Sequence, residues 1–283
     1  MQPKALMTGL LFGESPRWHQ DRLWVSDWGA RQIVAVDLEG KSEVMVRLPP
    51  ASFQPVCMDW LPDGRLLVVS AEESVLLGSK PDGTLDVYAD LRSLSKTGWN
   101  EIVVDGRGNA YVNGGGLAPP SGDIAPGVIA LVKADGSIAQ VADDFAFPNG
   151  MTVTPDNSTL IIAESHRKRL TAFDIGADGR LSHRRVWADL SGGVPDGICS
   201  DVEGAVWYAD VPNKRCVRVR EGGAVLQTIE LDRGCFACAL GGSERTTLFM
   251  VVREWRGMAS ATDRDITADV VFAPAPARGA GWP

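Results

Sequence analysis

Residues 149–161, Asn-Gly-Met-Thr-Val-Thr-Pro-Asp-Asn-Ser-Thr-Leu-Ile, contain a polar residue, a short apolar strand, an Asp-containing turn and a second apolar strand. The same order of features occurs in residues 100–112 and again in residues 196–208. The polar residues that open these three segments are 49 and 47 positions apart: Asn100, Asn149 and Asp196. Such a constant spacing indicates a chain built from structural repeats.

Less complete copies extend the repeat to both ends of the chain. Residues 56–64 repeat the strand and its turn, residues 14–18 open an earlier copy, and residues 238–242 open the last. Six units in 283 residues average about 47 residues each. Between turns such as Asp-Gly, nearly every segment is a short run rich in Val, Ile, Leu and Trp, which is typical of β-strands. The sequence therefore predicts an all-β, six-bladed β-propeller with a central channel and about four strands per blade, forming a single domain over residues 1–283.

A propeller of this kind needs a way to close its ring. We expect residues 5–12 to pair with the sheet that carries residues 270–273, because that pairing removes a free sheet edge. The 31 Gly and 17 Pro residues agree with the many turns of such a fold. The 9 Trp residues are expected to pack between neighbouring sheets.

Composition excludes several classes of partner. The formal net charge of −8 argues against nucleic-acid binding, which needs a basic surface. The longest apolar runs are far too short to span a bilayer, and the first residues lack the pattern of a signal peptide. We therefore expect a cytoplasmic protein that acts on a small molecule, with no nucleic-acid or membrane partner. The sequence leaves the oligomeric state open.

The five cysteines are expected to be reduced thiols in that compartment. Cys235 and Cys238 form a Cys-x-x-Cys motif, but no second Cys or His pair accompanies them as a structural zinc site requires. The surrounding residues indicate a strand, in which these two thiols are expected to point to opposite faces.

The polar residues at the start of the repeats are expected to converge. The innermost strand of each blade lines the channel, so equivalent positions from different blades meet at one of its ends. Two carboxylates and two amides occupy those positions: Glu14, Asn100, Asn149 and Asp196. An all-oxygen set with two negative charges suits a hard divalent cation, with water or substrate completing its coordination. Ca²⁺ is the favoured ion, and Mg²⁺, Mn²⁺, Zn²⁺ and Fe²⁺ are alternatives.

Three segments of the chain resemble the signature segments of the gluconolactonase/regucalcin family. They are residues 13–18 (Gly-Glu-Ser-Pro-Arg-Trp), 148–150 (Pro-Asn-Gly) and 195–197 (Pro-Asp-Gly), and the resemblance continues through residues 235–237 to the terminal Gly-Ala-Gly-Trp-Pro. It implies a six-bladed propeller with a catalytic divalent metal. Glu14, Asn149 and Asp196 match the family's metal ligands, and Asn100 matches a fourth polar residue that binds metal or substrate.

The resemblance implies hydrolysis of a small sugar or other aliphatic lactone, a carboxylic ester. The metal would polarise the carbonyl, and Asp196 would remove a proton from the attacking water as general base. Diisopropyl fluorophosphatase resembles the same family, so organophosphate hydrolysis with Asp196 as nucleophile is one alternative. A non-catalytic propeller that binds calcium or another ligand is the other.

One segment departs from the sugar-lactone members of the family. They tend to carry Arg-Phe-Asn-Asp, with the Arg on substrate hydroxyls, whereas this chain has Gly-Trp-Asn-Glu at residues 98–101. We therefore expect a wider, less sugar-specific site. Its predicted substrate-binding residues are Trp99, Asn100, Glu101 and Phe236, of which the two aromatic side chains would form an apolar wall. The loop at residues 117–126 is predicted to cover the channel.

Overall fold

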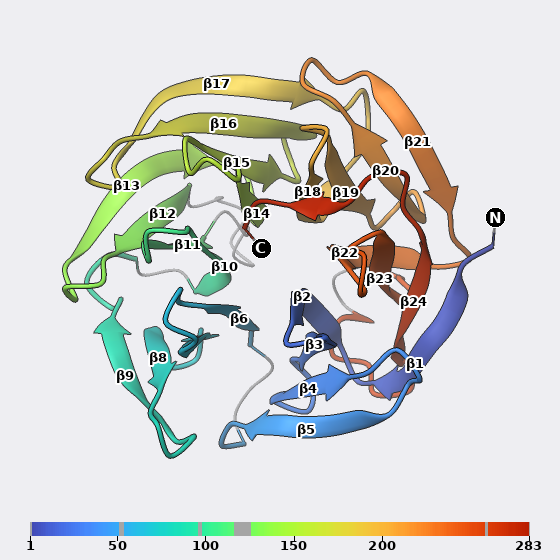
Figure 1. Cartoon of the computed structure of the whole chain (residues 1–283), viewed down its shortest axis with the longest axis horizontal. Helices are drawn as coiled ribbons and strands as arrows, with labels where there is room; N and C mark the ends of the chain where they lie inside the picture. Colours follow the sequence, from blue (N-terminus) through green and yellow to red (C-terminus); the bar gives the residue numbers. More distant parts are fainter. Residues whose placement is uncertain (1, 51–53, 96–97, 116–125, 258–259, 283) are drawn as a thin grey trace.

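Six antiparallel sheets follow one another around a ring in the computed structural model, which describes residues 2–50, 54–95, 98–115, 126–257 and 260–282 (Figure 1). No α-helix occurs in these ranges, and they accordingly contain no helix with the length and apolar character needed to cross a membrane. The predicted all-β, six-bladed propeller is confirmed.

The first three blades are four-stranded and run outward from the ring axis in chain order. Blade 1 consists of β2 (Gly13–His19), β3 (Arg22–Asp27), β4 (Gln32–Val36) and β5 (Ser42–Arg47). Blade 2 consists of β6 (Val56–Trp60), β7 (Leu66–Ser70), β8 (Val75–Ser79) and β9 (Leu85–Asp90). Blade 3 consists of β10 (Trp99–Val104), β11 (Ala110–Gly114), β12 (Gly127–Val132) and β13 (Ile138–Phe145).

The remaining blades repeat this plan, with additions from the two ends of the chain. Blade 4 consists of β14 (Pro148–Val153), β15 (Thr159–Glu164), β16 (Arg169–Ile175) and β17 (Leu181–Asp189). Blade 5 consists of β18 (Pro195–Asp201), β19 (Val206–Asp210), β20 (Arg215–Val219) and β21 (Val225–Glu230), with β25 (Gly279–Ala280) added beside β18. Blade 6 consists of β22 (Gly234–Gly241), β23 (Thr247–Arg253), β24 (Ala268–Pro274) and β1 (Lys4–Leu10).

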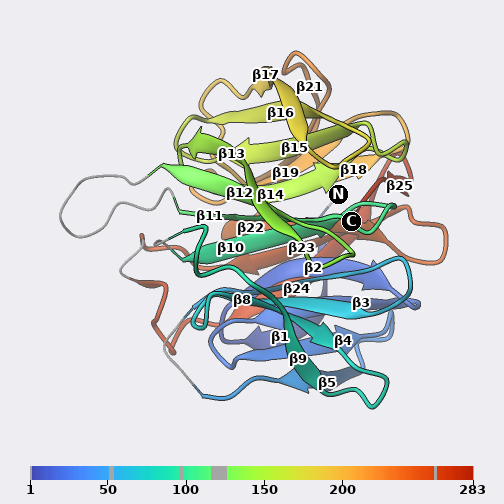
Figure 2. The same cartoon turned by 90° about the vertical axis from the view of Figure 1, so that its left-hand side faces the viewer.

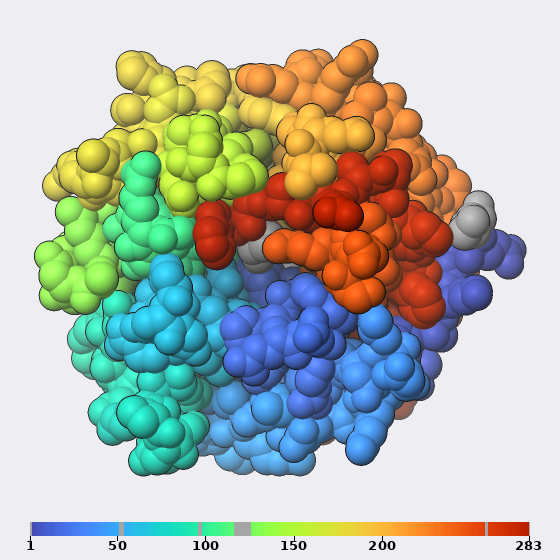
Figure 3. Space-filling view, in the orientation of Figure 1, coloured from blue at the N-terminus to red at the C-terminus, as the bar shows by residue number. Residues whose placement is uncertain are grey.

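The ring is closed where the sequence predicts. Strand β1 pairs antiparallel with β24, from Lys4 opposite Phe272 to Leu10 opposite Ala268. The start of the chain therefore lies beside its last long strand. Colours run from blue through green and yellow to orange around the molecule, and the red C-terminal part extends to its centre (Figure 3). Turned on edge, the stacked sheets are visible side by side (Figure 2). This pairing leaves blade 6 with a full complement of four strands.

The hydrophobic core is divided among the spaces between neighbouring blades. Each of six apolar clusters combines residues from two successive sheets, which is how a small sheet buries both of its faces. The predicted role of Trp is confirmed for several of these residues, which lie in or against such clusters: Trp18, Trp24, Trp60, Trp99, Trp187 and Trp207.

The cysteine prediction is half right. Residues 234–241 form strand β22, as expected, and the five thiols are free and buried. Cys235 and Cys238, however, lie in one cluster between blades 5 and 6. The expectation that they point to opposite faces is wrong because a β-bulge between Cys235 and Ala237 inserts an extra residue and reverses the alternation.

Candidate functional site

A β-bulge interrupts five of the six innermost strands within one or two residues of the start of the strand. The irregularity lies between Glu14 and Arg17 in β2, between Trp99 and Ile102 in β10, and at the equivalent positions of β14, β18 and β22. Strand β6 instead pairs regularly along its whole length. Bulges redirect side chains and are common beside active sites. The repeated bulges therefore affect which side chains of the innermost strands point toward the ring axis.

Three of the predicted ligands, Asn100, Asn149 and Asp196, lie within these bulges. Glu14 pairs with Ser26 and immediately precedes the bulge of β2. Glu14 is buried, whereas Asn100, Asn149 and Asp196 are partly exposed. Gly150 is packed directly against the backbone of Asp196 and Gly197, which sets the closest approach of β14 to β18. An added Cβ at Gly150 would lie 2.5 Å from the backbone nitrogen of Ile198 and 2.7 Å from the backbone carbonyl oxygen of Asp196.

Hydrogen bonds fix the orientation of the two amides. Nδ2 of Asn100 donates to Oδ1 of Asn149 and to the Pro148 carbonyl, both at 3.4 Å. Nδ2 of Asn149 donates to the Ser165 hydroxyl at 3.4 Å. Both amide nitrogens therefore point at protein acceptors. An amide oxygen has two lone pairs, so Oδ1 of Asn149 can accept the hydrogen bond from Asn100 and still bind a cation or substrate.

The two carboxylates are electrostatically strained. Burial and the charges of Asp196 and Glu101 raise the pKa of Glu14 well above its ordinary value. Burial raises the pKa of Asp196 as well, with further increases from Glu101 and Cys238. Blades 1 and 5 are not neighbours, so the effect of Asp196 on Glu14 acts across the ring. Such a pair is stabilised when a cation offsets its charge.

This donor set fits a hard divalent cation. Two carboxylates would balance the charge of such an ion, and two amide oxygens add neutral donors of the kind that Ca²⁺ accepts. Within the described ranges, no group of three or more His, Cys, Asp or Glu side chains is arranged to hold a metal. A cation at this position would therefore depend on the amides as well as on the two acids.

A buried ionic network lies beside the two acids. The Glu101 carboxylate accepts hydrogen bonds from the Ser15 hydroxyl and from Nη2 of Arg17, each at 3.1 Å. Nε of Arg17 lies 4.0 Å from the Asp59 carboxylate. The residue predicted to contact substrate, Glu101, is thus engaged with blade 1, and it is only 5% exposed.

Asp59 links blades 2 and 3 and provides a pH-dependent element of stability. Its carboxylate accepts a hydrogen bond of 2.7 Å from the Val104 amide, and burial raises the pKa of Asp59 to about 6 from an ordinary value of 3.8. An acid whose pKa is raised by folding contributes fully to stability below its unfolded pKa, and this contribution is lost as pH rises through the folded pKa.

We expect the Asp59→Asn variant to gain stability relative to the native chain as pH rises from about 4 to about 7, by roughly 2–3 kcal/mol, because Asn cannot ionise. Chemical denaturation of both proteins over this pH range measures the difference. A difference in unfolding free energy that stays constant with pH would contradict the assignment.

The two predicted aromatic contacts are packed inside the protein. Trp99 is 1% exposed and belongs to the cluster between blades 2 and 3. Phe236 is 4% exposed and packs edge-on against Phe12 and Trp255, in a smaller aromatic cluster. Neither ring is brought to the four polar residues by a described contact. Residues 117–125 of the predicted covering loop lie outside the described residues.

Several polar residues that support the site were not predicted. Nδ2 of Asn113 donates to the Asn149 carbonyl at 2.6 Å and joins blade 3 to blade 4. The Ser165 hydroxyl donates to the Pro195 carbonyl at 2.7 Å and joins blade 4 to blade 5. Arg17 and Asp59 belong to the same class of inter-blade link. The sequence signal for Asn113, Ser165 and Asp59 is a polar side chain in or directly after an otherwise apolar strand, whereas Arg17 lies in the mostly polar strand β2.

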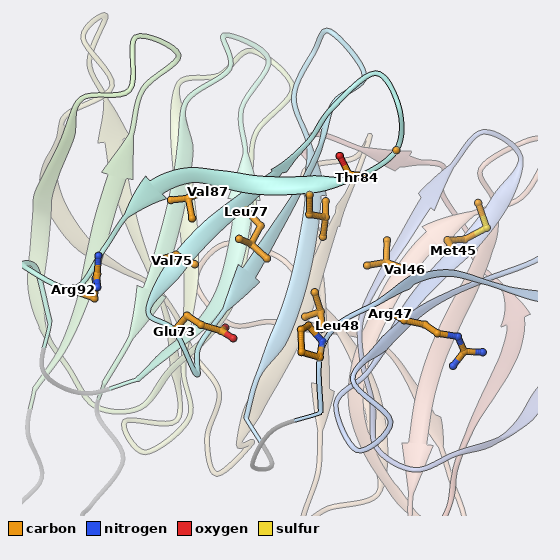
Figure 4. Close-up of a pocket in the computed structure, with 13 residues that line it drawn as sticks. Met45, Val46, Arg47, Leu48, Glu73, Val75, Leu77, Thr84, Val87 and Arg92 are labelled. Atoms are coloured by element: carbon orange, nitrogen blue, oxygen red, sulfur yellow. The ribbon is translucent and has the colours of Figure 1, made fainter.

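A separate groove of about 680 Å³ lies away from this constellation, between the outer strands of blades 1 and 2 (Figure 4). Its lining includes Met45 and Leu48 from the blade 1 side and Glu73, Val75 and Leu77 from the blade 2 side. None of the predicted site residues lines it.

Comparisons with known proteins identify related sequences and similar folds. Diisopropyl-fluorophosphatase of Loligo vulgaris is 26% identical over 204 residues, covering 64% of this chain and 63% of that protein, so the match spans less than two thirds of the relative. The pentonolactonase of Haloferax volcanii is 24% identical over 269 residues, covering 93% of this chain and 88% of that protein.

Among solved structures, regucalcin of Agrobacterium tumefaciens, described as a calcium-binding protein, superposes with a TM-score of 0.78 at 20% identity. The superposition covers 99% of this chain and 95% of that chain, and it shows the shared fold. The family profile matches residues 12–253, which include the innermost strands of all six blades. The chain therefore belongs to the SMP-30/gluconolactonase/LRE-like family.

Proposed function

We propose that this protein is a divalent-metal-dependent lactonase that hydrolyses a small lactone. The observation that carries the proposal is a set of polar residues in or directly beside the bulges of four innermost strands: Glu14, Asn100, Asn149 and Asp196. It combines two carboxylates with raised pKa values and two amides whose nitrogens are engaged elsewhere. Ca²⁺ is the proposed ion, in keeping with the oxygen donors and with the calcium-binding relative.

Two of the polar residues, Asp196 and Asn100, have proposed roles in addition to holding the cation. A bound cation would supply electrophilic polarisation of the lactone carbonyl and stabilise negative charge that develops on its oxygen. Asp196, partly exposed at the ring axis, would accept the proton of the attacking water. Asn100, whose amide nitrogen is held by Pro148 and Asn149, would present its oxygen to the cation or to the substrate.

Two observations support a proposal for the substrate class: the substrates of a relative and the residue at position 98. Lactones are the substrates named for the pentonolactonase relative. Gly98 stands where sugar-lactone members tend to carry an arginine, so we propose a small aliphatic or sugar lactone with weak selection for hydroxyl groups. We further propose that the protein works in the cytoplasm on this free small molecule.

Removing the metal tests the proposal directly. We expect exhaustive chelation to abolish acid release from a panel of sugar and aliphatic lactones, and re-addition of Ca²⁺ to restore it. Mg²⁺, Mn²⁺, Zn²⁺ and Fe²⁺ are added in parallel to identify the most effective ion. Full activity in the chelated protein would overturn metal dependence, and metal binding without turnover of any lactone would favour a calcium-binding protein without catalytic activity.

The similarity to diisopropyl-fluorophosphatase favours organophosphate hydrolysis as the second candidate. In that reaction Asp196 would attack phosphorus as a nucleophile instead of acting on water. Measuring kcat/KM for a phosphotriester beside the lactone panel separates the two activities. A higher value for the phosphotriester than for every lactone would select this alternative.

A further inference from the structure

One carboxylate oxygen of Glu101 accepts hydrogen bonds from three donors. Oε1 accepts hydrogen bonds from the Ser15 hydroxyl at 3.1 Å, from Nη2 of Arg17 at 3.1 Å and from the Ile102 amide at 2.9 Å. Two of the donors come from blade 1 and the acceptor comes from blade 3, so this contact spans the strand β6 that lies between them around the ring. The carboxylate of Glu101 is therefore held by groups from blade 1 and from its own blade 3.

Arg17 has little freedom to release that carboxylate. Its Nη2 also donates to the Ile102 carbonyl at 2.7 Å, and its Nη1 donates to the Pro16 carbonyl at 3.0 Å. The residue is 5% exposed, and its Nε lies 4.0 Å from Asp59. A guanidinium held in this way offers a fixed direction of attraction to Glu101.

Glu101 is nevertheless close enough for its negative charge to act on the residues that would hold the cation. It follows Asn100 directly in the bulge of β10, and Ser15 follows Glu14 directly in the bulge of β2. Its negative charge contributes to the raised pKa values of both Glu14 and Asp196. Yet Glu14, Glu101 and Asp196 are not arranged as a three-acid metal site in the described structure.

We propose that Arg17 is a positioning residue that keeps Glu101 from serving as a third carboxylate ligand of the cation. The ligand set then carries a net charge of −2, from Glu14 and Asp196. The inference rests on the proposed cation site. Arg17 offsets the charge of Glu101, and the remaining pair matches a divalent ion without excess negative charge. A third carboxylate ligand would bind the cation more tightly and leave fewer coordination positions for substrate.

Removing Arg17 should release this constraint. In the Arg17→Met variant, Glu101 keeps its charge but loses its counterion, and a divalent cation becomes the nearest available replacement. We expect Ca²⁺ to bind the metal-free variant about tenfold more tightly than it binds the native chain. We also expect the variant to melt at a lower temperature without metal and to show a larger rise in melting temperature on adding Ca²⁺.

The experiment uses the full chain, with Ca²⁺ affinity measured by titration calorimetry and stability by thermal melts in chelator and in Ca²⁺. The double variant Arg17→Met/Glu101→Gln is the matched control, since it removes the ion pair as a whole, and native-like affinity is expected. Arg17→Lys retains the positive charge beside Glu101 and is expected to bind Ca²⁺ within about twofold of the native value.

Each outcome decides the matter. Tighter binding in Arg17→Met together with native affinity in the double variant supports the proposal. Unchanged or weaker binding in a folded Arg17→Met protein overturns it while leaving the metal site intact, as does tight binding that persists after Glu101 is replaced. If Arg17→Met does not fold, the Ca²⁺ affinity of Arg17→Lys decides. Tighter binding by Arg17→Lys than by the native chain would show that a positive charge at position 17 does not keep Glu101 from the cation. Absence of Ca²⁺ binding by the native chain overturns the proposed site itself.

Discussion

Replacing Asp196 by Asn is expected to reduce lactone hydrolysis by a factor on the order of 10³ or more while leaving the protein folded. The substitution keeps the shape of the side chain but removes both a ligand charge and the proposed proton acceptor. Because folding raises the pKa of Asp196 above its ordinary value of 3.8, ionisation of this residue opposes folding as pH rises above that value. The metal-free variant is therefore also expected to melt a few degrees higher than the native chain, about 2–4 °C for each kcal/mol gained.

The matched control is Asp63→Asn. Asp63 and Asp196 both precede glycine, but Asp63 lies in an exposed turn, where it forms an ion pair with Arg65. This control should retain native kcat/KM and native Ca²⁺ affinity. Equal activity in the two variants, measured by acid release, would mean that Asp196 is not needed for hydrolysis and would end the catalytic proposal.

Replacing Gly150 by Ala should have the second-largest effect, through geometry rather than charge. The three atoms nearest to an added Cβ belong to the backbone of residues 196–198, at 2.5 to 2.8 Å, so no side-chain rotation relieves the contact. Strands β14 and β18 would have to separate. We expect a loss of about 3 kcal/mol in unfolding free energy and a decrease of about 100-fold in kcat for the folded protein, because Asn149 and Asp196 move apart.

Gly98→Ala provides the comparison for this variant. Gly98 also lies at the start of an innermost strand, but an added Cβ there has only the Gln54 amide oxygen nearby, at 3.9 Å. Denaturant unfolding and lactone kinetics should show little change. If Gly150→Ala were as stable and active as Gly98→Ala, the close approach of blades 4 and 5 would not control the site.

Much of the architecture could be predicted from the sequence because each blade is a local unit. A strand-turn-strand pattern recurs about every 47 residues, and the opening residues of three copies, Asn100, Asn149 and Asp196, lie at equivalent places in the innermost strands. The closing pair, β1 with β24, follows from the need to remove a free edge. The same repeat register predicts that Glu14 belongs with these three residues, and this assignment remains a prediction about function.

The side-chain environments were harder to predict. Simple alternation along a strand assigns Cys235 and Cys238 to opposite faces, but the bulge in β22 cancels that rule. Trp99, expected to contact substrate, belongs to the core between two blades. In β22 the register of pairing with β23 decides the direction of the two thiols, and a single sequence does not reveal the bulge that sets it.

By itself, then, the sequence determined the number of blades, the closure of the ring and the positions at which polar groups enter it, since these depend on short segments and their spacing. Only the tertiary structure decided how those groups are paired. Arg17 and Glu101 are separated by 84 positions, and Asp59 contacts the Val104 amide across 45 positions. Such contacts form only when different blades are brought together, because buried charges must then find partners wherever the packed ring provides them.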